Sequence, residues 1–155
     1  MGINRGKQFE KQIEAALLNV PATTVDRQHD QTTGYLGSSN VCDYIAYHYP
    51  HQYYFECKSC YGNTLNWSAI TKTQWDGLLA KSDCPGVVAG YFIWFIDHDV
   101  TIFVDAEWMR FLKDLGDKSF HVIKSLEKLQ GHFYIVPGEK RRVLFDYDLT
   151  DFLGE

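Results

Sequence analysis

The sequence predicts an α/β fold in which helices flank a mixed sheet, and three observations predict it. Residues 86–96, "GVVAGYFIWFI", are almost continuously apolar, which is typical of a strand covered on both faces. Residues 43–59, "DYIAYHYPHQYYFECKS", are rich in aromatic and β-branched residues on either side of Tyr49-Pro50, which indicates two strands joined by a short turn. Near the start of the chain, apolar residues recur four apart, as on one face of a helix.

Three helices are expected, each from a local signal. The first covers residues 4–20, where the apolar residues recur at helical spacing before a proline. The second covers residues 69–82 and follows the hairpin. The third covers residues 105–116, with Asp105 as its N-cap and Gly116 as its C-terminal stop.

The remaining strands and loops are expected where β-branched, aromatic or turn-forming residues cluster. They are a strand at 23–30, loops at 31–40 and 62–68, a strand at 100–104 and a second hairpin at 131–147. This second hairpin is expected to turn at Pro137-Gly138. The length suits one packed core and no repeat or linker interrupts the chain, so we expect a single domain over residues 1–155.

The overall charge limits the possible partners. A formal net charge of −5 argues against a protein that passively coats DNA, since nucleic-acid binding modules are usually basic. It is compatible with an enzyme whose acidic site is neutralised by a divalent metal, with basic residues gathered locally. No apolar stretch is long enough to span a membrane, and the first residues are too charged for a signal peptide. We therefore expect a cytoplasmic protein with reduced cysteines.

The first hairpin brings acids together. If its turn is centred on Tyr49-Pro50, antiparallel register places Asp43 opposite Glu56, and Lys58 emerges on the same face two residues later. Two carboxylates so close repel each other unless a cation lies between them. Hard oxygen ligands favour magnesium or manganese, so this pattern predicts a metal site with a lysine beside it. The alternative is an exposed strand face on which Glu56 and Lys58 form a weak surface ion pair.

The cysteines allow a different interpretation. Cys57 and Cys60 have ligand-like spacing, and the same register puts Cys42 opposite Cys57 on the face away from Asp43. With Cys84 or a histidine, they could form a structural zinc site in an interaction domain. A single Cys-X-X-Cys without a second pair is weak support, and small buried cysteines are common in cores.

The hairpin "DYIAYHYPHQYYFECK" resembles the PD-(D/E)XK nuclease signature, an Asp on one strand followed by Glu-X-Lys on the next. "NRGKQFE" (residues 4–10) and "TKTQWDGLL" (residues 71–79) narrow the resemblance to RecU-type Holliday-junction resolvases, particularly compact, phage-like members. The resemblance implies a restriction-endonuclease-like fold and a magnesium-dependent endonuclease of DNA recombination and repair, in which manganese substitutes. It also implies branched DNA as substrate (four-way junctions, with three-way or flap structures possible), a homodimer, and the host cytoplasm if the protein is phage-encoded. The rival interpretation is a non-catalytic DNA- or partner-binding module on the same fold.

The resemblance also implies roles for individual residues. Asp43, Glu56 and the backbone carbonyl of Cys57 would bind the metal, while Lys58 would position or deprotonate the attacking water and stabilise charge on the phosphate. Gln74 would lie beside the metal and the scissile phosphate. The remaining candidates are Glu10 as an accessory acid and Arg5, Lys7 and Arg27 as DNA contacts.

Some of these residues have competing explanations. Thr71 to Gln74 match a capping box, so Gln74 could serve only its own helix, and Glu10 could be a solvated helix residue. The family's usual Pro before the first Asp is absent, because Val41-Cys42 stand there. The segment at residues 26–42 is short where RecU-type proteins carry a long stalk, so cleavage chemistry is better supported than strict four-way specificity.

Overall fold

The computed structural model describes residues 4–28 and 40–154. The predicted loop at 31–40, apart from Asn40, and the last two residues of the predicted strand at 23–30 lie outside these ranges. No helix in the described ranges has the length and apolar character needed to cross a membrane.

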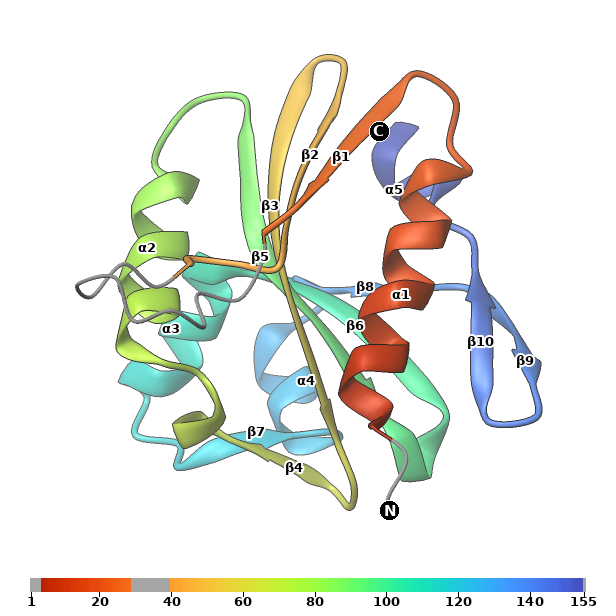
Figure 1. Cartoon of the computed structure of the whole chain (residues 1–155). Helices are drawn as coiled ribbons and strands as arrows, with labels where there is room; N and C mark the ends of the chain where they lie inside the picture. The colour runs from red at the N-terminus through yellow and green to blue at the C-terminus, as the bar shows by residue number, and fades with distance from the viewer. Residues whose placement is uncertain (1–3, 29–39, 155) are drawn as a thin grey trace, which may run out of the picture.

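A six-stranded mixed sheet forms the centre of the molecule, with strand order β1-β2-β3-β5-β6-β8 (Figure 1). Its strands are β1 (Thr23–Arg27), β2 (Tyr44–His48), β3 (His51–Cys60), β5 (Val87–Phe95), β6 (Val100–Asp105) and β8 (Tyr134–Ile135). Only β3 and β5 pair in parallel, and the crossover between them contains α2 (Lys72–Ser82), as a parallel connection requires. The predicted α/β fold with a helix-flanked mixed sheet is confirmed.

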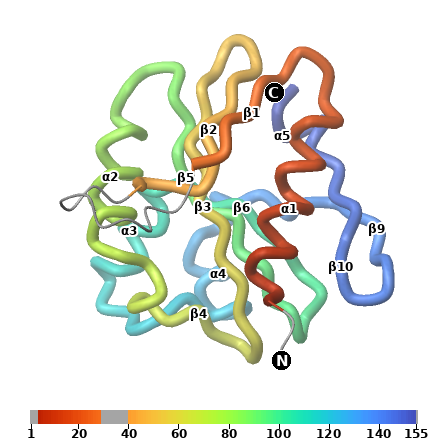
Figure 2. Tube along the Cα trace, viewed as in Figure 1, coloured from red at the N-terminus to blue at the C-terminus, as the bar shows by residue number. Residues whose placement is uncertain are grey.

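Helices and a small hairpin cover the two faces of the sheet. Helix α1 (Arg5–Leu18) packs on one face with α5 (Thr150–Gly154) and β10 (Leu144–Tyr147), which pairs with β9 (Gly138–Arg141). The other face carries α2, α3 (Ala106–Asp114) and α4 (Lys124–Leu129). The trace in Figure 2 shows α1 and the β9–β10 hairpin on one side of the sheet and α2 and α3 on the other.

The apolar strand β5 joins both cores. Tyr91, Ile93 and Phe95 belong to the core on the α2 side, while Phe92 and Trp94 belong to the core on the α1 side. All five are at most 1% exposed, so the interpretation of this run as a strand covered on both faces is confirmed.

Helix ends follow the local chemistry. The Asn4 side chain accepts a hydrogen bond from the Lys7 amide at the start of α1. Helix α2 starts at Lys72 rather than at residue 69, because Thr71 and Gln74 form a capping box there. Asp105 occupies the N-cap position of α3 but makes no side-chain cap hydrogen bond, and Gly116 follows that helix in a left-handed conformation (φ 94°).

The second hairpin was predicted at the wrong turn. Its strands are β9 and β10, joined at Arg142-Val143 rather than at Pro137-Gly138. Residues before Pro137 instead form β8, which pairs with β6, and the Val136 amide continues that pairing by donating to the Thr101 carbonyl at 2.9 Å. Pro137 has no N–H to extend the ladder, so the chain leaves the sheet at this point.

Several short elements gave no clear signal in the sequence. The predicted loop at 62–68 contains strand β4 (Thr64–Asn66) and the start of the 3₁₀ helix η1 (Trp67–Ala69). Strand β4 pairs with β7 (Ser119–His121), which lies far along the chain. A second 3₁₀ helix, η2 (Ile96–His98), forms the turn between β5 and β6.

Candidate active site

The β2–β3 hairpin has the register that was predicted from a turn centred on Tyr49-Pro50. His48 pairs with His51 and Tyr44 with Phe55, and the Asp43 amide donates to the Phe55 carbonyl at 3.0 Å just beyond the end of β2. The Asp43 carboxylate accepts a hydrogen bond from the Cys57 amide at 2.8 Å. Asp43 therefore lies across from Glu56, close enough for the two carboxyl groups to share a hydrogen bond when one is protonated.

Glu56 is a buried carboxylate with one satisfied and one unsatisfied oxygen. Its side chain lies 3.1 Å from the Lys58 ammonium and 3.0 Å from the Gln74 amide nitrogen, both measured to Oε2. Oε1 is buried and has no hydrogen-bond partner among the described residues, and Glu56 as a whole is 3% exposed. A buried carboxylate oxygen without a donor is unfavourable, so this side chain is incompletely neutralised by the protein alone.

Both carboxyl groups are held in environments that favour protonation. Burial, followed by the repulsion from Asp43, raises the pKa of Glu56 to about 8, while Lys58 acts in the opposite direction. Burial also raises the pKa of Asp43, against the lowering effects of the Cys57 amide and Lys58. The site thus contains two acids for which one lysine is an insufficient counter-charge.

Gln74 caps its own helix and also contacts Glu56. Its backbone N–H donates to the Thr71 hydroxyl at 3.2 Å, and its side-chain Oε1 accepts from the Thr71 amide at 3.1 Å, which completes the capping box. The other end of the same side-chain amide, Nε2, donates to Glu56. The cap therefore fixes the side chain in the orientation that reaches the acid.

The other candidate residues surround the acids at greater distance. The Arg27 guanidinium lies 3.5 Å from the Glu10 carboxylate, which is 15% exposed, and the negative charge of Glu10 contributes to the raised pKa of Glu56. Lys7 is near enough to lower the pKa of Asp43. Arg5 instead donates to Gln8 on its own helix at 2.8 Å. The structure therefore brings Asp43, Glu56, Lys58 and Gln74 into contact, with the others around them or, for Arg5, elsewhere on α1.

The expectation that Cys42 and Cys57 share a face is wrong. Cys42 packs with the α2-side core and Cys57 with the α1-side core. Strand β2 begins only at Tyr44, so strict alternation does not extend back to Cys42. Burial raises the pKa of the Cys42 thiol to about 12, that of Cys60 to about 11 and that of Cys57 far above its usual range.

In the described part of the chain, no three His, Cys, Asp or Glu side chains converge in a way that could hold a metal ion. The Asp43–Glu56 pair supplies two carboxylates, one side chain short of such a group. The donor set fits a hard divalent cation, because two carboxylates repel each other and one buried oxygen lacks a partner.

Tyr91 is a neighbour of this site that the sequence did not indicate. It is the register partner of Glu56 in the parallel β3–β5 pair, and its hydroxyl is buried without a hydrogen-bond partner in the described structure. Burial and the charge of Glu56 both raise its pKa. Tyr91 lies within an almost continuous apolar run, so only the pairing of the two strands reveals its place beside the acid.

Comparison with known proteins gives a family and a fold. The sequence model of the family described as "Recombination protein U" (RecU) matches residues 8–147 of this chain. Among solved structures, the chain is similar to Hjc from Archaeoglobus fulgidus, described as a Holliday junction resolvase from an archaeal hyperthermophile, with a TM-score of 0.50 and 16% sequence identity. That similarity covers 66% of this chain and 78% of the Hjc chain, and at this identity it concerns the fold. No curated protein sequence matches this chain.

Proposed function

Because the chain belongs to the RecU family of Holliday-junction resolvases, we propose that it is a divalent-metal-dependent endonuclease that cuts branched DNA by phosphodiester hydrolysis. The observation that supports this most directly is Glu56. A buried acid beside a second acid, with one oxygen unpartnered, has a physical explanation if the site is completed by a cation.

In this proposal Asp43 and Glu56 hold Mg²⁺, with Mn²⁺ able to replace it, and the backbone carbonyl of Cys57 completes the protein ligands. When bound, such an ion polarises a phosphate and lowers the pKa of a coordinated water. The Asp43 carboxylate already accepts a hydrogen bond from the Cys57 amide, which fixes its orientation toward the second strand.

Lys58 and Gln74 act around the two acids. Lys58 would position the attacking water or stabilise negative charge on the phosphate as an ammonium, or accept the proton of that water as the neutral amine; its nitrogen lies 3.1 Å from Glu56 Oε2. Gln74 holds Glu56 in place through its amide nitrogen while its own side chain is fixed by the helix cap. Glu10 serves as an accessory acid, oriented by Arg27.

The basic residues provide the proposed contacts with DNA. Lys7 and Arg27 lie close to the acids, and their charges would attract phosphates on either side of the scissile bond. Arg5 would contact a phosphate further along the strand from the start of α1. Local positive charge of this kind is compatible with the acidic chain as a whole.

We also propose that residues 1–155 act as a single nuclease domain that pairs as a homodimer in the cytoplasm. Resolution of a four-way junction needs two symmetric incisions, and a two-fold dimer supplies two equivalent sites. The segment that replaces the family's stalk, residues 26–42, lies mostly outside the described residues. Its shortness in the sequence is the reason to expect that three-way and flap structures are cut as well as four-way junctions.

A side-by-side cleavage experiment tests this proposal. Labelled four-way, three-way, flap and linear duplex substrates of equal arm length are incubated under single-turnover conditions, with and without magnesium. Asp43→Asn serves as the inactive variant, and Asp114→Asn, on the exposed surface of α3, as the matched control. We expect magnesium-dependent cutting of all three branched substrates, loss of cutting in Asp43→Asn and wild-type rates in Asp114→Asn.

The possible results separate the parts of the proposal. Cutting confined to four-way junctions would contradict the broader specificity that we infer from the short segment. Efficient cutting of linear duplex would exclude a junction-resolving role. Binding of branched DNA without cleavage in either magnesium or manganese would favour a non-catalytic DNA-binding module.

A further inference from the structure

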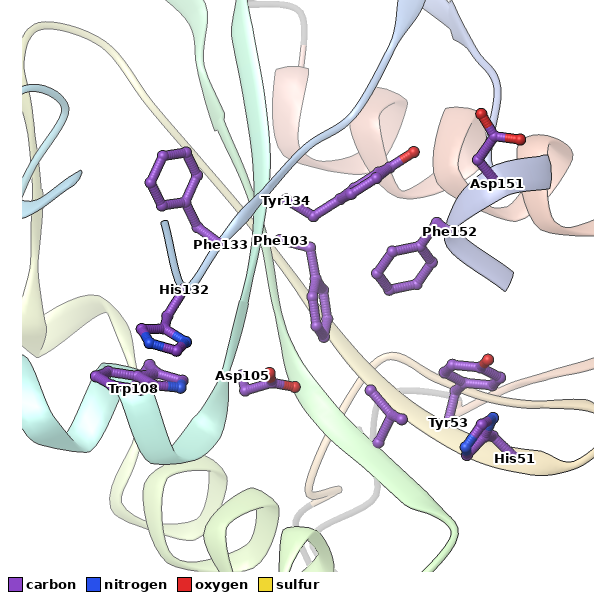
Figure 3. Close-up of a pocket in the computed structure, with 11 residues that line it drawn as sticks. His51, Tyr53, Phe103, Asp105, Trp108, His132, Phe133, Tyr134, Asp151 and Phe152 are labelled. Atoms are coloured by element: carbon purple, nitrogen blue, oxygen red, sulfur yellow. The ribbon is translucent and has the colours of Figure 1, made fainter. Parts of the chain in front are cut away.

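A cavity of about 410 Å³ is lined by residues other than those of the candidate active site (Figure 3). Its lining draws on both cores: Tyr53 and Phe103 belong to the α1-side core, while Trp108 packs against the α2-side core. Glu56, from the same strand as Tyr53, points instead toward Gln74 on α2. Its lining residues are His51, Tyr53, Val88, Phe103, Asp105, Trp108, His132, Phe133, Tyr134, Asp151 and Phe152. A cavity of this volume is in the range that small-molecule sites occupy.

Aromatic rings form most of its wall. Phe103 and Phe152 meet edge to face with their centroids 4.9 Å apart, and Trp108 stacks on the His132 imidazole at 3.9 Å. Figure 3 shows Asp105 between this stacked pair and the rings of Phe103 and Tyr53. The faces of aromatic rings carry partial negative charge and attract cations.

Apart from two histidines, the lining is acidic rather than basic. The carboxylates of Asp105 and Asp151 line the cavity, and none of its described lining residues is Lys or Arg. The Asp105 side chain makes no cap hydrogen bond, although the residue stands at the N-cap position of α3. Burial, followed by the charge of Glu107, raises the pKa of Asp105 to about 6, while His132 acts against them. Asp105 therefore has no Lys or Arg as a counter-ion among the described residues that line the cavity, and His132 is the neighbour that favours its charged form.

His51 contributes a second polar atom without a partner. Its Nδ1 is buried and makes no hydrogen bond to any described residue. The centroid of its ring lies 6.0 Å from that of the Tyr53 ring. Unpaired buried polar atoms cost free energy unless a ligand or water satisfies them. Asp105 thus offers a carboxylate, and His51 an unpartnered ring nitrogen, at a cavity whose other walls are mainly rings.

We propose that this cavity binds an organic cation, a guanidinium or alkylammonium group, with Asp105 as its counter-ion and the surrounding rings as its wall. The carboxylates of Asp105 and Asp151 would repel a phosphate, and a neutral apolar ligand would bury Asp105 further without pairing it. A cation satisfies the acid and the ring faces together. This function is separate from DNA cleavage and does not depend on it.

The tryptophans provide an internal readout. The chain has four, and among them only Trp108 lines the cavity. In metal-free buffer, indole N–H signals are followed by NMR while n-propylguanidinium, n-butylammonium or the neutral n-propylurea is added. We expect the cations to shift the Trp108 signal selectively and to bind at least about tenfold more tightly than n-propylurea, since a full charge interaction is involved. Equal affinity for the urea, or no Trp108 shift, would overturn the proposal without reference to any variant.

Two variants locate the counter-ion. Asp105→Asn keeps the size and the N-cap preference of the residue but removes its charge, and should weaken n-propylguanidinium binding roughly tenfold or more. Glu107→Gln is the matched control, because it removes an equal charge nearby from a residue that does not line the cavity. We expect less than a twofold change for that control. Equal losses in both variants would indicate only a general effect of net charge and would contradict direct pairing with Asp105.

Two further ligands identify the source of the cation. A blocked Gly-Arg-Gly tripeptide presents the guanidinium as a protein side chain would, and spermidine presents ammonium groups as a free metabolite. Tighter binding of the tripeptide would indicate a partner protein's arginine, and tighter binding of spermidine a free polyamine. Failure of both to shift Trp108 would overturn a role for the cavity in recognising cations of biological size.

Discussion

Glu56 is the side chain on which stability and proposed activity conflict most. Its pKa is raised from 4.5 to about 8, so the folded chain retains a proton that the unfolded chain releases across this range. Stability in metal-free buffer should therefore fall as pH rises from about 4.5 to about 8. The destabilisation caused by a charged Glu56 carboxylate is fully present above its folded-state pKa and absent below its unfolded-state pKa.

Replacement of this acid should stabilise the protein while it abolishes cleavage. We expect Glu56→Gln to be more stable than the wild type by roughly 1–2 kcal/mol at pH 8.5, because the loss of Lys58's partner offsets part of the gain, and equally stable near pH 4. Urea unfolding in EDTA across this pH range measures the difference, and single-turnover cleavage should fall at least about a hundredfold. Glu139→Gln, on the exposed hairpin β9–β10, is the control. Parallel pH profiles for Glu56→Gln and wild type would show that the acid is not strained.

Among the elements, the start of helix α2 allows the effect of a substitution on stability to be distinguished from its effect on cleavage. Thr71→Ala removes the hydroxyl that caps the helix but leaves Gln74 able to reach Glu56, so it should cost about 1 kcal/mol of stability with cleavage within about threefold of wild type. Gln74→Glu preserves a capping-box residue but replaces the donor to Glu56 with a third carboxylate, so cleavage should fall at least about tenfold with little loss of stability.

Thermal unfolding and single-turnover cleavage of both variants, measured at the same temperature, distinguish these effects. The expected pattern is opposite in the two proteins: Thr71→Ala loses stability and Gln74→Glu loses activity. If activity simply followed stability in both, Gln74 would be a helix cap and nothing more.

The accuracy of the sequence predictions also varies from element to element. The β2–β3 register was predictable because a short turn fixes every pair that follows it, and this alone places Asp43 opposite Glu56. The contact between Gln74 and Glu56 was not predictable from spacing, since it depends on how α2 packs against β3. Tyr91 was missed for the same reason, because its proximity to Glu56 arises from a parallel pairing across a crossover.

Where sequence predictions were wrong, a tertiary contact outweighed a local signal. Pro137-Gly138 is a strong turn signal, but the residues before it do not form a hairpin strand. They pair with β6 at the edge of the central sheet instead. Cys42 was placed by alternation that the chain abandons before β2 begins. The roles proposed for all the site residues remain predictions. Of the outer ones, Glu10 and Lys7 lie near the acid pair, and Arg27 lies beside Glu10.

For the whole molecule, a divalent cation should act as a stabilising ligand. A ligand that binds only the folded state stabilises it by about 1.4 kcal/mol at ten times its dissociation constant, which corresponds to a few degrees in the melting temperature of a chain this long. We expect millimolar magnesium or calcium to raise the melting temperature by that amount, and calcium to support junction binding with little cleavage.

The control for this measurement is the double variant Asp43→Asn, Glu56→Gln, with sodium chloride used to match ionic strength. The double variant should start with a higher melting temperature in EDTA and gain nothing from either cation. An equal rise in the variant would place the binding elsewhere on this acidic chain.

The β2–β3 hairpin also has a consequence for the order of folding. The two acids belong to one local hairpin, which closes a short loop, whereas Gln74 and Tyr91 reach them only after the β3–β5 crossover has formed. If the hairpin forms first, as its short loop favours, the chain brings two like charges together before the helix that supports them is in place. Since the repulsion would be present in the earliest native-like pairing, divalent cations should increase the refolding rate measured by stopped-flow fluorescence. A cation that only slowed unfolding would mean that the acids meet late, after the sheet has closed.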